Sequence, residues 1–122
     1  MSITIKRVYE PAAKSDGYRV LVDRLWPRGL KKEDAALDAW TKELAPSSAL
    51  RKWFGHDPAR WEAFRHRYAT ELDGVSEYWQ PLATKASRLR ITLLYGARDD
   101  EHNNAVALKC YLDAWLKGHG PH

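Results

Sequence analysis

Charged and aromatic side chains follow a short apolar run in the first quarter of the sequence. The run spans residues 18–22 and is rich in β-branched residues, and it is followed by Asp23, Arg24, Trp26 and Arg28. Arginine holds a carboxylate or a phosphate through paired, charge-assisted hydrogen bonds, and an aspartate can act as a general base. These residue types indicate a site for a small anionic ligand. In it, Asp23 is a candidate catalytic residue and the other three are candidates for binding.

A second polar cluster follows the apolar run at residues 91–95. It consists of Tyr95, Arg98, Asp99 and Asn103. Asp99 or Asn103 is expected to begin the last helix, where free backbone N–H groups and the helix dipole favour an anion. Asp99 is the second candidate catalytic base, and the other three side chains are candidates for ligand binding.

The two clusters are expected to meet at one edge of a sheet. A long helical segment separates the strands predicted at residues 18–22 and 91–95, and parallel neighbours need such a connection. Parallel strands end at the same edge, where open α/β folds usually bind their ligands. The alternative is structural, because an Asp and an Arg close in sequence often pair to anchor a loop. Trp26 and Pro27 would then be the apolar plug of that loop.

A third candidate lies in residues 42–51. Ser47 is placed to cap a helix, and Lys42 and Arg51 flank it, so these three side chains could bind a phosphate. The alternative is a capped helix on the surface. No glycine-rich phosphate loop supports the phosphate interpretation, because Gly96 stands alone and forms neither a dinucleotide fingerprint nor a Walker loop.

Nucleophilic and metal chemistry have less support. Cys110 falls between Leu108 and Leu112 in a predicted helix, and we expect it to be buried and structural. Apart from Asp99 and His102, the histidines lack the spacing of metal ligands, so we expect no metal site. The sequence identifies no cofactor.

Hydrophobic periodicity predicts a single α/β domain over residues 1–122, with a small, mostly parallel sheet and about five helices. Residues 117–122 are expected to be a flexible tail. The sheet should have three or more strands, with the first on either edge. Strands are expected at residues 3–8, 18–22 and 91–95. Short helical pieces are expected within residues 31–46, a helical turn capped by Ser47 over residues 47–54, and helices at residues 58–72, 76–86 and 103–118.

Charge and cysteine content indicate the kind of ligand and the cellular compartment. The net charge of +4 comes from 20 Lys and Arg against 16 Asp and Glu, and the excess lies in residues 1–32. This favours anionic ligands but is well below the charge of a dedicated nucleic-acid arm. A single cysteine fits a reducing compartment, and no signal peptide or membrane span is recognisable, so we expect a cytoplasmic protein without membrane association.

Several long motifs resemble those of the YeaO-like proteins, a bacterial and archaeal group within domain of unknown function 488. The motifs are residues 17–29, Trp40, Lys42, residues 45–47, residues 50–54, Arg67-Tyr68, Glu71-Leu72, residues 93–99 and Asn103. The resemblance implies a small cytoplasmic α/β protein and covers nearly the whole chain. Some relatives carry a histidine where this chain has Asn104, which weakens proposals of histidine or metal chemistry. Cysteine motifs of other branches are absent.

Three functions are compatible with these features. The first is binding or turnover of a small anionic ligand. The second, less favoured, is a nucleic-acid-binding module, which requires a basic stripe with exposed aromatic side chains. The third is a non-catalytic interaction protein in which Asp23 and Arg24 brace the fold and leave no accessible cavity. The sequence leaves open whether the protein is an enzyme and what its oligomeric state is.

Overall fold

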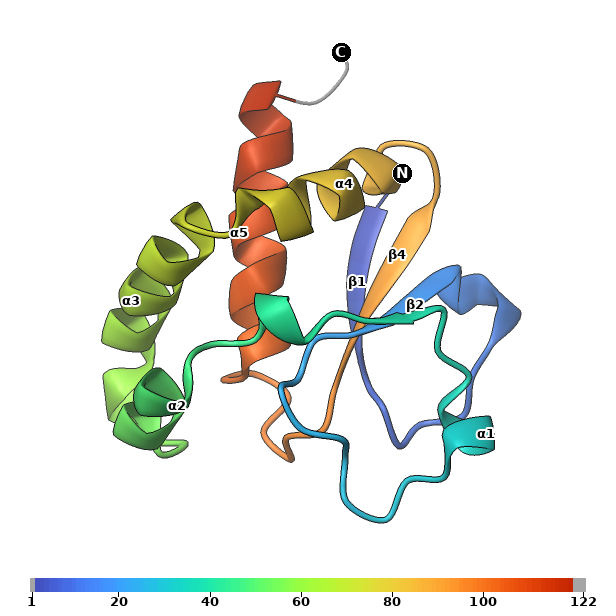
Figure 1. The fold of residues 1–122 in the computed structure, drawn as a ribbon, viewed down its shortest axis with the longest axis horizontal. Coiled ribbons are helices and arrows are strands. Elements are labelled where there is room, and N and C mark those ends of the chain that lie inside the picture. Colours follow the sequence, from blue (N-terminus) through green and yellow to red (C-terminus); the bar gives the residue numbers. More distant parts are fainter. Residues whose placement is uncertain (1, 120–122) are drawn as a thin grey trace.

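One sheet of four parallel strands forms the centre of the protein (Figure 1). A computed structural model describes residues 2–119. The strands are β1 (Ser2–Arg7), β2 (Tyr18–Leu21), β3 (Ala39–Trp40) and β4 (Arg90–Tyr95). Their order across the sheet is β1-β4-β2-β3. The prediction that the second and last strands are parallel neighbours is therefore confirmed, and β1 occupies the edge beside β4.

Five α-helices occur within residues 2–119, so the predicted α/β class with a parallel sheet is confirmed. They are α1 (Lys32–Ala35), α2 (Ser48–Phe54), α3 (Trp61–Asp73), α4 (Ser76–Ala86) and α5 (Asn104–His119). The ends of the helices follow local signals. Asp57 accepts a hydrogen bond from the Ala59 amide at the turn that leads into α3, and Gly74 ends that helix. No helix in this part of the chain is long and apolar enough to cross a membrane.

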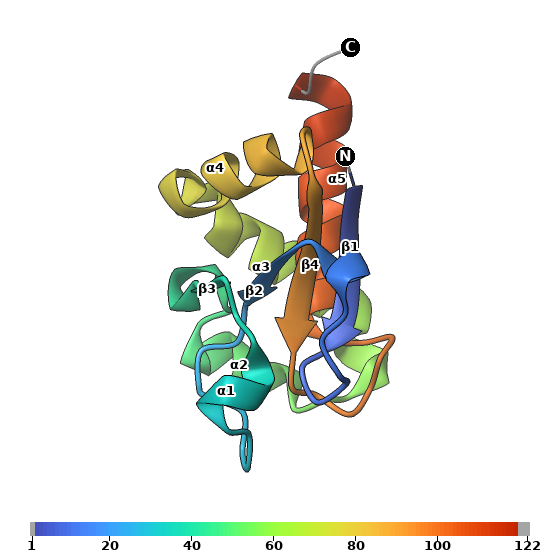
Figure 2. The same ribbon diagram turned by 90° about the vertical axis from the view of Figure 1, so that its right-hand side faces the viewer.

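The main core lies between the sheet and helices α2 to α5, which cover one face of it (Figures 1 and 2). Alternation along β4 explains this arrangement, because successive side chains of a strand point to opposite faces. Ile91, Leu93 and Tyr95 join the helix-side core, whereas Leu94 belongs to a separate cluster on the other face. The loop after β2 and helix α1 lie on that other face (Figure 2).

A buried ion-pair network stabilises the face of the sheet opposite the main core. Arg19 is 4% exposed and donates to the Asp16 carboxylate at 2.5 Å and to the Ala36 carbonyl at 3.0 Å. Lys6 lies 3.1 Å from the same carboxylate. Burial opposes ionisation of Asp16, but the hydrogen bonds from the Ala13 amide, Lys6 and Arg19 outweigh it and lower the pKa. The polar residues are therefore satisfied internally.

The prediction of short helical pieces within residues 31–46 is wrong at β3. Ala39 and Trp40 pair with β2, and the hydrogen bonds from Asp38 N to Arg19 O (2.9 Å) and from Thr41 N to Leu21 O (3.0 Å) extend this pairing. The strand was missed because two residues are too few to display a period of two.

The expectation that Cys110 is buried is also wrong, because its side chain is exposed. Leu108 and Leu112 share the inner face of α5, and a residue two positions from each of them points away from that face. The helix extends to His119, one residue beyond its predicted end. Residues 120–122, the rest of the segment predicted to be flexible, lie outside the described residues.

Candidate functional site

A cavity of about 540 Å³ opens at the carboxyl edge of the sheet, between the loop after β2, helix α2 and the start of α5. This is the edge at which the sequence placed the site. Its walls combine basic, aromatic and small apolar side chains. They are Asp23, Arg24, Leu25, Ala45, Pro46, Ser48, Arg51, Lys52, Phe54, His56, Phe64, Ala97, His102, Asn103 and Asn104. Of the eleven candidate residues from the sequence, Asp23, Arg24, Arg51 and Asn103 line this cavity.

Asp23 joins the two polar segments that follow β2 and β4. Its Oδ2 accepts a hydrogen bond from the Gly96 amide at 2.9 Å, and its Oδ1 accepts one from Asn104 Nδ2 at 3.2 Å. Asn104 also donates to the Val22 carbonyl at 3.0 Å. Burial raises the pKa of the Asp23 carboxyl, although these two hydrogen bonds and the charge of Arg51 act in the opposite direction. Both carboxylate oxygens are therefore engaged in holding the edge together.

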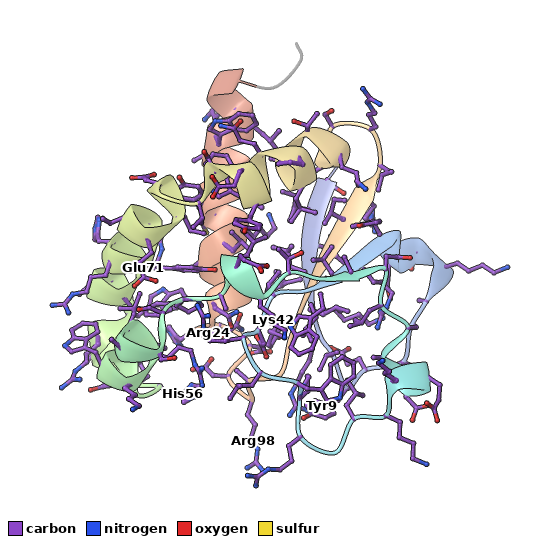
Figure 3. All side chains as sticks on the ribbon, viewed as in Figure 1. Tyr9, Arg24, Lys42, His56, Glu71 and Arg98 are labelled. Atoms are coloured by element: carbon purple, nitrogen blue, oxygen red, sulfur yellow. The ribbon has the colours of Figure 1, made fainter. Side chains whose placement is uncertain are left out.

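Two arginines supply positive charge on the cavity wall. Arg24 lies on the loop after β2, on the side of the molecule toward α2 (Figure 3), and it reaches the carbonyl oxygens of Ala45 and Pro46 only at 3.4 Å. Bonds of this length are weak and leave most of the donor capacity of the guanidinium unused. Arg51 is exposed, near enough to lower the pKa of Asp23. The two guanidinium groups can therefore bind an anion.

Ser47 caps helix α2 as predicted, because its Oγ accepts a hydrogen bond from the Leu50 amide at 3.1 Å. Its backbone N–H and hydroxyl also donate to the two oxygens of Glu71, at 2.8 and 2.6 Å. Glu71 lies on α3, so this contact ties the start of α2 to a neighbouring helix (Figure 3). Ser47 is occupied in this way, and its neighbour Ser48 lines the cavity instead.

The segment before α5 forms a turn around Asp99. One oxygen of Asp99 accepts hydrogen bonds from the amides of Glu101 (2.9 Å) and His102 (3.0 Å), which lower its pKa together with the His102 ring. The other oxygen lies 3.0 Å from His102 Nδ1. Asn103 caps α5, because its Oδ1 accepts from the Val106 amide at 3.0 Å. Asp99 thus orients His102, which lines the cavity.

The remaining candidates lie away from the cavity. Trp26 packs edge-on against Trp40, with ring centroids 5.3 Å apart, and its indole N–H donates to the Leu30 carbonyl. Trp26 therefore fills the loop as an apolar plug, as expected if the loop is structural. Tyr95 is buried in the main core.

Three basic candidates have exposed side chains, and none of them lines the cavity: Arg28, Lys42 and Arg98. Lys42 lies over the Trp40 ring at 4.4 Å. Arg98 extends away from the body of the protein (Figure 3).

Several cavity residues were not recognised from the sequence. Lys52, Phe54 and Phe64 follow ordinary helical spacing, and nothing in that spacing separates a cavity wall from a core. His56 is different, because Gly55 and His56 both adopt left-handed backbone conformations, with φ of 54° and 56°. A glycine before a histidine was a usable signal for a tight turn there. Among the described residues, no cluster of His, Cys, Asp or Glu could hold a metal ion.

Comparison with known families gives a match over nearly all of the chain. A protein-family model described as the inactive DUF488-N3 subclade matches residues 2–120. The chain belongs to this subclade. The resemblance to YeaO-like proteins found in the motifs is thereby confirmed.

Individual relatives agree with the family match. YeaO of Escherichia coli (strain K12), an uncharacterised protein, is 48% identical over 112 residues, which cover 92% of this chain and 97% of YeaO. Uncharacterised proteins of Mycobacterium bovis and Mycobacterium tuberculosis are 47% identical over 70 residues, covering 57% of this chain and 59% of theirs. No solved structure is significantly similar to this chain.

Proposed function

We propose that this protein binds a small anionic ligand in the cavity at the carboxyl edge of the sheet. The observation that carries the proposal is an imbalance of charge on the cavity wall. Arg24, Arg51 and Lys52 supply three cations, whereas the single acidic lining residue, Asp23, already accepts hydrogen bonds at both of its oxygens. An anion would restore the balance and would use guanidinium donors that the protein leaves weakly bonded.

Binding without turnover is the second part of the proposal. Asp23 and Asp99 were the candidate bases, but backbone amides and neighbouring side chains engage both oxygens of each carboxylate. A general base needs an oxygen within reach of the substrate proton. The description of the subclade as inactive also supports a binding role. The exposed thiol of Cys110 supports the cytoplasm, a reducing compartment, as the location.

The two other functions have weaker support. Asp23 behaves as the brace hypothesis requires, yet a cavity remains beside it, so bracing and binding can coexist at this edge. A nucleic-acid surface would need exposed aromatic platforms. Each of the six tryptophans is at least partly buried, and Trp53 lies under the guanidinium groups of Arg60 and Arg67 at 5.1 and 3.9 Å. The exposed large aromatic side chains within residues 2–119 are Tyr9 and Tyr78, and they lie on separate elements, the turn after β1 and helix α4.

Calorimetric titration with ribose 5-phosphate and with inorganic phosphate tests the binding. Arg51→Gln should weaken both ligands by about tenfold or more, because a charge-assisted hydrogen bond contributes about 1.5–3 kcal/mol. Arg51 is exposed, so the fold should be unaffected. Arg88→Gln is the matched control, since Arg88 is also exposed and does not line the cavity. Equal binding by wild type and Arg51→Gln would contradict the proposal.

Turnover is tested separately by ³¹P NMR. Ribose 5-phosphate incubated with the protein should keep its phosphorus spectrum unchanged over hours. Appearance of inorganic phosphate or of a second ester, lost in the Asp23→Asn variant, would refute the non-catalytic part of the proposal while leaving the binding part intact.

A further inference from the structure

The cavity has an aromatic side as well as a basic one. Phe54, His56, Phe64 and His102 all line it, and they come from α2, the turn after α2, α3 and the segment before α5. The two phenylalanine rings stack with their centroids 4.4 Å apart, and both are almost fully buried. They form a fixed apolar floor, which a bare anion would not use.

His102 is held in one orientation on this side of the cavity. Its Nδ1 lies 3.0 Å from the Asp99 carboxylate, and its ring stands edge-on to Trp61 at 5.3 Å and 82°. With Nδ1 occupied, the other ring nitrogen, Nε2, is the one left for a ligand. The ring is thereby ready to contact a planar group without losing freedom on binding.

Leu25 adds an exposed apolar group to the wall. Leu25 is 65% exposed, the highest value among the exposed large hydrophobic residues that the structure describes, and it lines the cavity. Its position on the wall lets a ligand with an apolar surface cover it and bury apolar area. Leu25 follows Arg24, so one short segment offers the anion and the apolar surface adjacent contacts.

From these contacts we infer that the ligand carries an aromatic or heteroaromatic ring beside its anionic group, as a nucleoside monophosphate does. The inference rests on the proposed anion-binding function and specifies its ligand class. The cavity volume of about 540 Å³ lies in the range of about 300–1,000 Å³ that holds whole small organic molecules. The anion lies against Arg24 and Arg51, and the ring lies against Leu25 and the aromatic wall.

AMP and ribose 5-phosphate form a matched pair of probes, because AMP carries a base where ribose 5-phosphate carries its anomeric hydroxyl. In calorimetric titration, wild type should bind AMP at least about fivefold more tightly, since stacking a base on aromatic side chains contributes about 1–3 kcal/mol. Leu25→Ser should weaken AMP by about three- to fivefold, from the lost apolar burial, and leave ribose 5-phosphate unchanged. Leu89→Ser, another exposed leucine remote from the cavity, is the control.

The possible results distinguish the proposed ring contacts from the proposed anion contacts. Equal affinities for AMP and ribose 5-phosphate, both weakened by Arg51→Gln, would overturn the aromatic ligand class and keep the anion site. A preference for AMP that is unchanged in Leu25→Ser would overturn the placement of the ring. No binding of either probe would overturn both this inference and the proposed function.

Discussion

Replacing Asp23 with alanine is expected to destabilise the fold, because the structure makes this residue a brace between two strand ends. The change removes the acceptor of the Gly96 amide and of the Asn104 side chain. Losing a hydrogen bond to a charged group costs about 1.5–3 kcal/mol. Part of this loss is offset, because burial raises the pKa of Asp23 and so makes its charge costly to keep.

The net effect on the free energy of unfolding should be a loss of about 2 kcal/mol. With an unfolding entropy of about 2.1 cal/mol/K per residue, a chain of 122 residues loses about 4 °C in Tm for each kcal/mol. Asp23→Ala should therefore lower the Tm by about 8 °C. Differential scanning calorimetry measures this shift, and urea denaturation gives the free energy independently.

Asp100→Ala is the matched control, since Asp100 is an exposed carboxylate in the loop that follows β4. It should change the Tm by less than about 2 °C, as surface substitutions usually do. An Asp23→Ala variant with the wild-type Tm would show that Asp23 does not brace the two strand ends. If Asp23→Ala were as stable as wild type but no longer bound ribose 5-phosphate, Asp23 would be a ligand-contacting side chain and not a brace.

Three further predictions concern stability. Ser47→Ala removes a helix cap and a hydrogen bond to Glu71 and should cost about 2 kcal/mol in urea denaturation without weakening ribose 5-phosphate; the opposite pattern would make Ser47 a ligand. Gly17→Ala should lower the Tm sharply, because Gly17 has a φ of 68° and a Cβ there would collide with the Arg90 carbonyl oxygen; an unchanged Tm would contradict this geometry. Burial raises the pKa of Asp23 above 3.8, so its contribution favours folding at low pH and is lost as the pH rises through the folded-state pKa. The stability of Asp23→Asn relative to wild type should accordingly improve between about pH 4 and pH 7, and a constant difference would argue against it.

The arrangement of the main strands could be predicted because each has a clear pattern. A long helical segment separates the apolar runs that became β2 and β4, and it supplies the crossover that parallel neighbours need. Their shared edge followed, and with it the meeting of Asp23 with the segment after Tyr95. Strand β3 could not be found in this way, because its pairing depends on Asp38 and Thr41 bonding to the edge of β2.

A cavity lies at the edge where the sequence predicted a site, and four of the eleven candidate residues line it. Arg28 and Arg98 have the residue type of anion ligands, yet both are exposed and neither lines the cavity. The direction of a side chain in an irregular loop depends on backbone angles that no periodicity encodes. His102 was passed over because its role depends on the turn around Asp99, which forms through backbone amides. Phe54 could not be told from an ordinary core residue, because its helical spacing is the same for a core residue and for a residue on a cavity wall.

The most direct test of the central claim is to locate a bound anion. Crystals soaked in tungstate, a heavy analogue of phosphate, would reveal the anion by its anomalous scattering. We expect the strongest peak inside the cavity, within hydrogen-bonding distance of Arg24 and Arg51. A strongest peak beside Arg28 or Arg98, with an empty cavity, would contradict it.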